Sequence, residues 1–156
     1  MADYDDIIRI GTVSSVHPER HRVRVKFPDK DNLISYELPV IVRGSLKNKM
    51  QCLPDPGEAV LCVFLPNGEE QGFCLGSFYS AADLPASEDK EEYLLKIPGG
   101  VCISVNRADH TIQMVDYYGS KMIWSGGDIT FKSFRNINLN PDDDITVPDH
   151  INTLFD

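Results

Sequence analysis

The sequence predicts an all-β chain in two parts, a small closed barrel followed by a region of short strands that must associate with further copies of itself. Up to about residue 80, short runs of β-type residues alternate with turn-forming residues. Residues 81–92 then change abruptly to a small, polar and acidic composition. From residue 93 onward, short strands with one apolar face each are separated by Gly, Asn or Asp turns.

The first two runs predict a β-hairpin. Residues 8–14 form a β-type run, and residues 22–27 alternate strictly, with basic side chains on one face and Val23 and Val25 on the other. A half-buried strand is the structure that such alternation favours. The segment between the two runs contains Pro18 and is typical of a turn.

Three further runs follow in the first part, at residues 35–42, 58–65 and 71–78, and a Pro66-Asn67-Gly68 turn separates the last two. Five short strands with an intervening segment at residues 43–56 predict a barrel of the oligonucleotide/oligosaccharide-binding type (OB-fold) over residues 1–80, because closure leaves few exposed edges. An SH3-like barrel is the alternative.

Residues 81–92 are interpreted as an acidic linker, and residues 93–156 as a second domain with a tip. A unit of about sixty residues buries only about 60% of the surface of its unfolded chain, so strands with a single apolar face cannot form a core alone. We therefore predict a homotrimer whose chains wind their strands around a common axis. Its core would contain Val101, Ile103, Ile112, Met114, Ile129, Phe131, Ile137 and Leu139.

Composition and charge exclude several classes of function. The chain has 156 residues and a formal net charge of -9, which excludes a large multidomain enzyme and makes attraction to nucleic-acid phosphates unfavourable. The acidic N-terminus lacks the basic and apolar pattern of a signal peptide, and no apolar run reaches the ~18 residues of a membrane span. We expect synthesis in the cytosol and a soluble product.

The four cysteines are interpreted as small buried apolar residues. Cys52, Cys62, Cys74 and Cys102 include no C-x-x-C pair, and no histidine lies near enough in sequence to complete a zinc set. No catalytic constellation is found either, since there is no G-x-S-x-G elbow, no phosphate-binding glycine loop and no cysteine beside a basic partner. The sequence therefore predicts a protein that is not an enzyme.

Four motifs occur in an order that resembles a known family. They are Arg9-Ile10-Gly11-Thr12-Val13, Arg22-Val23-Arg24-Val25-Lys26-Phe27, Pro54-Asp55-Pro56-Gly57-Glu58-Ala59-Val60 and Gln71-Gly72-Phe73-Cys74-Leu75-Gly76-Ser77-Phe78-Tyr79. With Ile97-Pro98-Gly99-Gly100-Val101 they make the chain similar to the baseplate assembly protein V family of contractile phage tails. By extension, the chain resembles the central spikes of related contractile injection systems.

The resemblance implies a homotrimer with an N-terminal OB-fold barrel and a C-terminal triple-stranded β-helix spike. Members of this family lie at the centre of the baseplate, bind the hub protein and tail tube, and lead the tube through the target cell envelope. The resemblance also implies synthesis in the cytoplasm of a bacterial host and a location in the baseplate of a virion or tail-like particle. Some relatives insert a lysozyme domain between barrel and spike, but residues 80–92 are too few to hold one.

The tip supplies the candidate metal ligands. Some relatives carry a His-x-His pair that surrounds iron by threefold symmetry, whereas this tip has the single His150. Asp142, Asp143 and Asp144 would bring nine carboxylates together in a trimer, as a calcium-type ion prefers. We favour a solvated acidic turn and a surface histidine, hence no cofactor. A separate tip protein bound at this end is a further alternative.

Two other functions remain open on the sequence. Arg22, Arg24 and Lys26 on one strand face would suit a single-strand nucleic-acid-binding barrel, although nearby acidic residues favour a solvated face or a hub contact and no nucleic-acid partner. Tyr117, Tyr118 and Trp124 would suit a polysaccharide-binding module, although packing in a core or an interface is the favoured interpretation.

Overall fold

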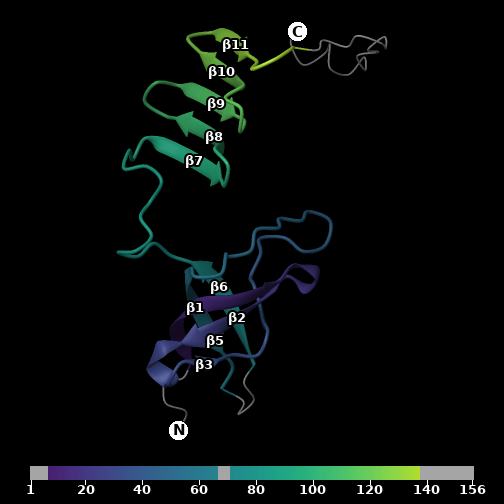
Figure 1. Cartoon of the computed structure of the whole chain (residues 1–156), viewed down its shortest axis with the longest axis vertical. Helices are drawn as coiled ribbons and strands as arrows, with labels where there is room; N and C mark the ends of the chain where they lie inside the picture. The colour runs from purple at the N-terminus through teal and green to yellow at the C-terminus, as the bar shows by residue number, and fades with distance from the viewer. Residues whose placement is uncertain (1–6, 67–70, 138–156) are drawn as a thin grey trace. The chain divides into compact units, whose positions relative to one another are not determined.

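The chain folds into two compact units, residues 1–85 and 86–156, built from antiparallel β-sheets (Figure 1). The computed structural model describes residues 7–66 and 71–137. Within these residues there is no α-helix, so the prediction of an all-β chain is confirmed. No helix that is long and apolar enough to cross a membrane is found in the same residues.

The first unit is a single curled sheet with the order β3-β2-β1-β5-β6, in which β4 also pairs with β2. Two 3-10 turns, η2 (Pro18–Arg20) and η3 (Pro28–Lys30), lie on either side of β2. Its strands are β1 (Ile8–His17), β2 (Arg22–Phe27), β3 (Leu33–Ile34), β4 (Leu38–Pro39), β5 (Ala59–Phe64) and β6 (Gly72–Ser77).

A parallel bridge closes this sheet into a ring of pairings. Val40 pairs with Cys74 of β6, and the amide of Ile41 donates to the Cys74 carbonyl oxygen at 2.9 Å. Because β4 pairs with β2 immediately before this bridge, residues 38–40 connect β6 back to β2, and the strand pairing forms a closed ring.

The predicted strand at residues 35–42 is interrupted. Ser35 turns its hydroxyl inward, where Oγ accepts from the Val25 amide at 3.0 Å and replaces a backbone acceptor. Pro39 has no amide hydrogen to donate to a ladder. Within the predicted run at residues 35–42, the structure therefore has only the two-residue strand β4 and the bridge at Val40, and β3 ends just before Ser35.

The core of the first unit lies inside the ring. The alternation of β2 is confirmed, since Val23, Val25 and Phe27 are all buried. A β-bulge between Val13 and Ser15 shifts the register of β1, so that both Val13 and Val16 pack on the core. The buried apolar side chains of this core are Val13, Val23, Val25, Phe27, Leu38, Val40, Val60, Cys62 and Cys74.

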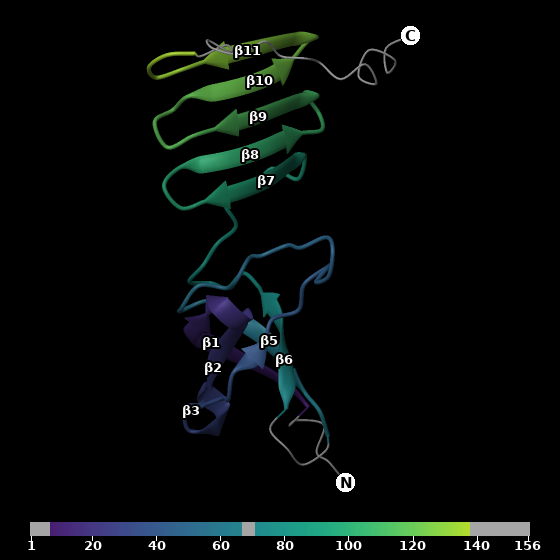
Figure 2. The same ribbon diagram turned by 90° about the vertical axis from the view of Figure 1, so that its right-hand side faces the viewer.

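The second unit is an antiparallel meander in which each strand pairs with the next one in the chain (Figure 2). Its strands are β7 (Glu92–Ile97), β8 (Val101–Asn106), β9 (Thr111–Val115), β10 (Lys121–Ser125) and β11 (Asp128–Lys132). The first of these begins at Glu92, one residue inside the predicted linker.

The turns of the meander have local sequence causes. Gly126 and Gly127 have φ values of 60° and 90° between the paired Ser125 and Asp128, and a two-residue hairpin turn of this kind requires positive φ at both positions. The Asp116 carboxylate Oδ1 accepts from the amide of Ser120 at 2.7 Å and so fixes the turn between β9 and β10.

We expect Gly11→Ala to destabilise the first unit by about 1–3 kcal/mol, because a well-packed core cannot admit another methyl group. A Cβ at Gly11 would lie 2.7 Å from the Lys26 carbonyl oxygen and against the Val25 side chain. Hydrogen exchange of the β1 and β2 amides measures the change. Ser14→Ala, at an exposed position of the same strand, is the control. Equal exchange in the two variants would contradict the prediction.

Candidate functional site

The strand register of the second unit places apolar side chains in rows that cross all five strands. One row joins Leu95, Ile103, Met114, Met122 and Phe131. A second row joins Tyr93, Val105, Ile112, Trp124 and Ile129. The rows are two residues apart on every strand, so they share one side of the sheet. These ten residues are called the apolar face.

The other side of the same sheet is mixed in character. One of its rows joins Leu94, Ser104, Gln113, Ile123 and Thr130. The next joins Lys96, Cys102, Val115, Lys121 and Lys132. Lysine, hydroxyl and amide side chains are suited to water, so this side needs no cover, in contrast to the apolar face.

Nothing in the described part of the second unit covers the apolar face. No residue between 86 and 137 is buried, and Leu95, Ile129 and Phe131 are each more than half exposed. Seven of the ten residues are exposed, and at about half of some 200 Å² each they present on the order of 700 Å², whereas the largest patch on a typical monomer is ~300–600 Å². An exposed face of this size marks an interaction site.

The sheet is hollowed at one end of its strands, where β8 and β10 begin and β9 and β11 end. Met114, Met122, Phe131 and Ile137 line a depression of about 500 Å³. Ile137 follows β11 and is about half exposed.

The predicted trimer-core residues gather on this side of the sheet. Ile103, Ile112, Met114, Ile129 and Phe131 belong to the apolar face itself. Val101 lies two residues before Ile103 on β8 and extends it, together with its partner Ile97. Leu139 lies outside the described residues.

Sequence reasoning missed half of the apolar face. The predicted trimer core does not include Tyr93, Leu95, Val105, Met122 and Trp124, all of which fall in the two rows. The signal was present for four of them, since Leu95, Val105, Met122 and Trp124 are each two positions from a predicted core residue or pair with one, whereas Tyr93 pairs with Val105. To place pairs such as Leu95 with Ile103 in one row, the register between neighbouring strands must be known, and the alternation within a single strand does not contain it.

The candidate metal ligands Asp142, Asp143, Asp144 and His150 lie outside the described residues. Among residues 7–66 and 71–137, no group of three or more His, Cys, Asp or Glu side chains is placed to hold a metal ion.

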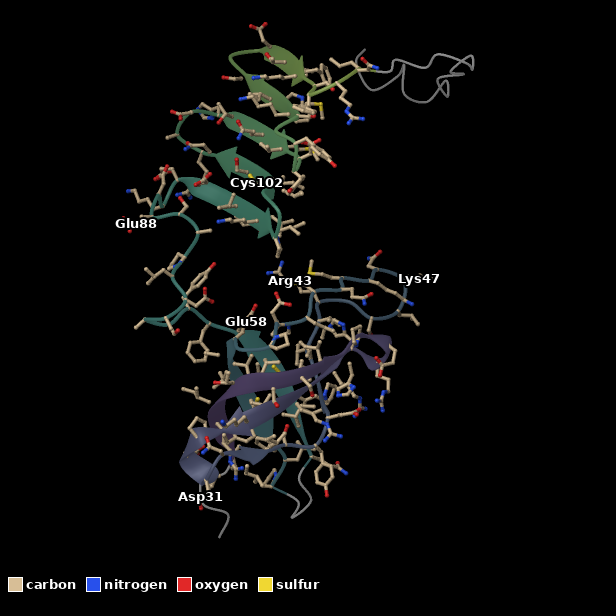
Figure 3. The ribbon with its side chains drawn as sticks, viewed as in Figure 1. Asp31, Arg43, Lys47, Glu58, Glu88 and Cys102 are labelled. Atoms are coloured by element: carbon tan, nitrogen blue, oxygen red, sulfur yellow. The ribbon has the colours of Figure 1, made fainter. Side chains whose placement is uncertain are left out.

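The cysteines correct one prediction. Cys62 and Cys74 are buried and pair across β5 and β6, but Cys52 is exposed on the loop between β4 and β5. Cys102, labelled in Figure 3, is half-buried on the mixed side of the second sheet. The hydrogen bond with Cys74 and burial raise the pKa of the Cys62 thiol, which keeps it neutral.

The basic face of β2 is largely occupied by one carboxylate. Glu37 accepts from Arg20 at 3.0 Å and lies 3.8 Å from both Arg24 and His17. Arg22 donates to the Glu37 carbonyl oxygen at 3.1 Å. These contacts reduce the positive potential that a single-stranded nucleic acid would need along this strand.

The three aromatic residues considered for glycan binding do not form one platform. Tyr117 and Tyr118 pack edge to face at 5.1 Å in the turn before β10, and Tyr118 stacks on Phe134 at 5.9 Å. Trp124 lies near the other end of β10, on the apolar face. About three residues of strand separate them, roughly 10 Å or more.

The sequence matches no model of a known protein family, and a search of curated proteins finds no similar sequence.

We expect Cys52 to be the fastest-reacting thiol of the folded protein, because it is exposed on a loop while Cys62 and Cys74 are buried. In a titration with an aromatic disulfide, one thiol per chain should react rapidly and Cys102 should react more slowly. Cys62 and Cys74 should react only in denaturant. Cys52→Ser should remove the rapid phase alone. Rapid reaction of the two buried thiols would contradict the burial seen at β5 and β6.

Proposed function

We propose that this chain is the structural, non-enzymatic central spike protein of a contractile tail baseplate, in a phage or a related injection system. The observation that carries the proposal is the apolar face, an uncovered side of a one-layer sheet. A soluble protein must cover a face of this size, and the family resemblance favours two further copies of the same chain as the cover.

The topology of the first unit supports an OB-fold barrel. Its first strand pairs with both β2 and β5, its last strand pairs with β5, and the segment after β4 pairs in parallel with β6. The strands thereby form a closed, five-membered ring of pairings around nine buried apolar residues. A closed small barrel of this kind matches the N-terminal domain that the resemblance implies.

The dimensions of the second sheet support three copies around one axis. Strands of five to six residues are about 17–20 Å long, and three such strands set as the sides of a triangle place the axis about 5–6 Å from each side. Met, Ile and Phe side chains span that distance, so the two rows of each chain would fill the centre. Two sheets packed face to face at about 10 Å are the alternative arrangement.

A trimer built in this way would be suited to a mechanical task. Separating one chain would expose its whole apolar face at once, which makes unfolding unfavourable and slow. In the proposal, the barrels bind the hub protein and tail tube, and the β-helix spike meets the target cell envelope on contraction. Any separate tip protein would bind beyond the described residues.

A solution mass of 52.5 kDa, three chains of 17.5 kDa, is the expected result of light scattering on a sizing column. An elongated trimer should also elute early for that mass. A compact species of 17.5 kDa would remove the basis of the spike proposal and favour the oligonucleotide-binding barrel. A species of 35 kDa would favour two sheets packed face to face.

Two neighbouring residues of β9 provide a matched test of the apolar face. Met114→Lys places a charge in the proposed trimer core, and a buried unpaired charge costs several kcal/mol, so we expect dissociation to monomers. Gln113→Lys adds the same side chain to the mixed side and should leave the mass unchanged. The measurement is again the absolute mass. Trimers in both variants would contradict this role of Met114.

A further inference from the structure

The first unit carries a second uncovered apolar surface, on the outer side of β1, β5 and β6. Ile8 pairs with Val63, which pairs with Phe73, and Ile10 pairs with Leu61 in the neighbouring row. With Leu75 of β6 and Phe78 just after it, these residues are called the outer patch. Its members are Ile8, Ile10, Leu61, Val63, Phe73, Leu75 and Phe78.

The outer patch is distinct from both the core and the rest of the exterior. The core residues of the same strands, Val13, Val60 and Cys74, point to the other side of the sheet. None of the seven residues of the patch is charged, whereas the outer side of β2 carries Arg22, Arg24 and Lys26. The first unit therefore has an apolar and a charged exterior side.

The patch is exposed and hollowed. Ile8 and Ile10 are each 59% exposed, and Ile10, Leu61, Leu75 and Phe78 line a depression of about 370 Å³. Five half-exposed large residues of about 200 Å² each give on the order of 500 Å² of apolar surface.

This area indicates what kind of partner covers it. A stable interface between free proteins buries about 800 Å² on each partner, so the outer patch is too small to hold two free copies together. It is large enough for units that another contact already holds nearby. Copies of this chain meet that condition if the second units form the proposed trimer.

The connection between the units keeps the three patches within reach. Residues 78–91 join β6 to β7 and span at most roughly 50 Å when fully extended. Tethering at this range gives an effective concentration on the order of millimolar for short flexible linkers. Each chain has a net charge of -9, so close approach of the copies is favoured only through an uncharged surface.

We propose that the outer patches of three copies meet at the trimer axis and form a second interchain core in the first units. This inference rests on the proposed trimer. The outer patch gives the first units of the trimer a contact surface of their own. In this arrangement the charged side of β2 faces outward.

Cysteine cross-linking of the full chain tests the contact. In a Cys52→Ser, Cys102→Ser background, Leu75→Cys places a thiol in the patch, and Arg24→Cys places one on the outer side of β2. Leu75 and the Arg24 side chain are both 46% exposed, so the two thiols should be equally accessible. A short bismaleimide should convert most of the Leu75→Cys protein to a 35 kDa linked pair, twice the 17.5 kDa chain, and leave Arg24→Cys unlinked.

The outcomes separate this inference from the proposed function. A 52.5 kDa trimer in which Leu75→Cys links no better than Arg24→Cys overturns the patch contact, leaves the spike proposal standing and assigns the patch to a different partner. A monomeric mass overturns both. If Leu75→Cys fails to fold, Ile10→Cys gives the same measurement from β1, where the side chain is more exposed.

Discussion

A β-sheet one layer thick that is apolar on one side must find a cover for that side, and the second unit of this protein is organised by that requirement. Its five strands place ten apolar side chains in two rows and leave the polar side chains on the reverse. No element in the described part of that unit folds back over them. The cover therefore has to come from outside these residues, and three copies around one axis are the proposed solution.

The two units meet the same requirement in different ways. In the first, the sheet curls until Val40 pairs with Cys74, so the inner sides of its strands cover one another and nine apolar residues are buried. In the second, within residues 86–137, every strand pairs only with its sequence neighbours, and β7 and β11 form the two edges of the sheet. Closure gives the first unit a core of its own, whereas an open meander depends on association for its stability.

This difference suits the proposed division of labour in a spike. A unit with its own core can present a stable surface to a hub, and Glu37 organises the charged side of that surface by holding Arg20, Arg24 and His17 nearby. A unit whose core exists only between chains cannot lose one chain without losing that core. Resistance to force along the spike would follow from this shared core rather than from any single strong contact.

The sequence by itself determined the all-β class, the alternation of β2 and the side of each strand of the second unit that is apolar, because these depend on the two-residue period of a strand. Tertiary structure decided the rest. Register between strands brought Leu95, Met122 and Trp124 into the apolar rows. The hydrogen bond from the Val25 amide to the Ser35 hydroxyl drew Ser35 inward and interrupted a predicted strand. Cys52 is exposed because it lies on the loop between β4 and β5. Such outcomes depend on residues far apart in the chain, which local periodicity does not encode.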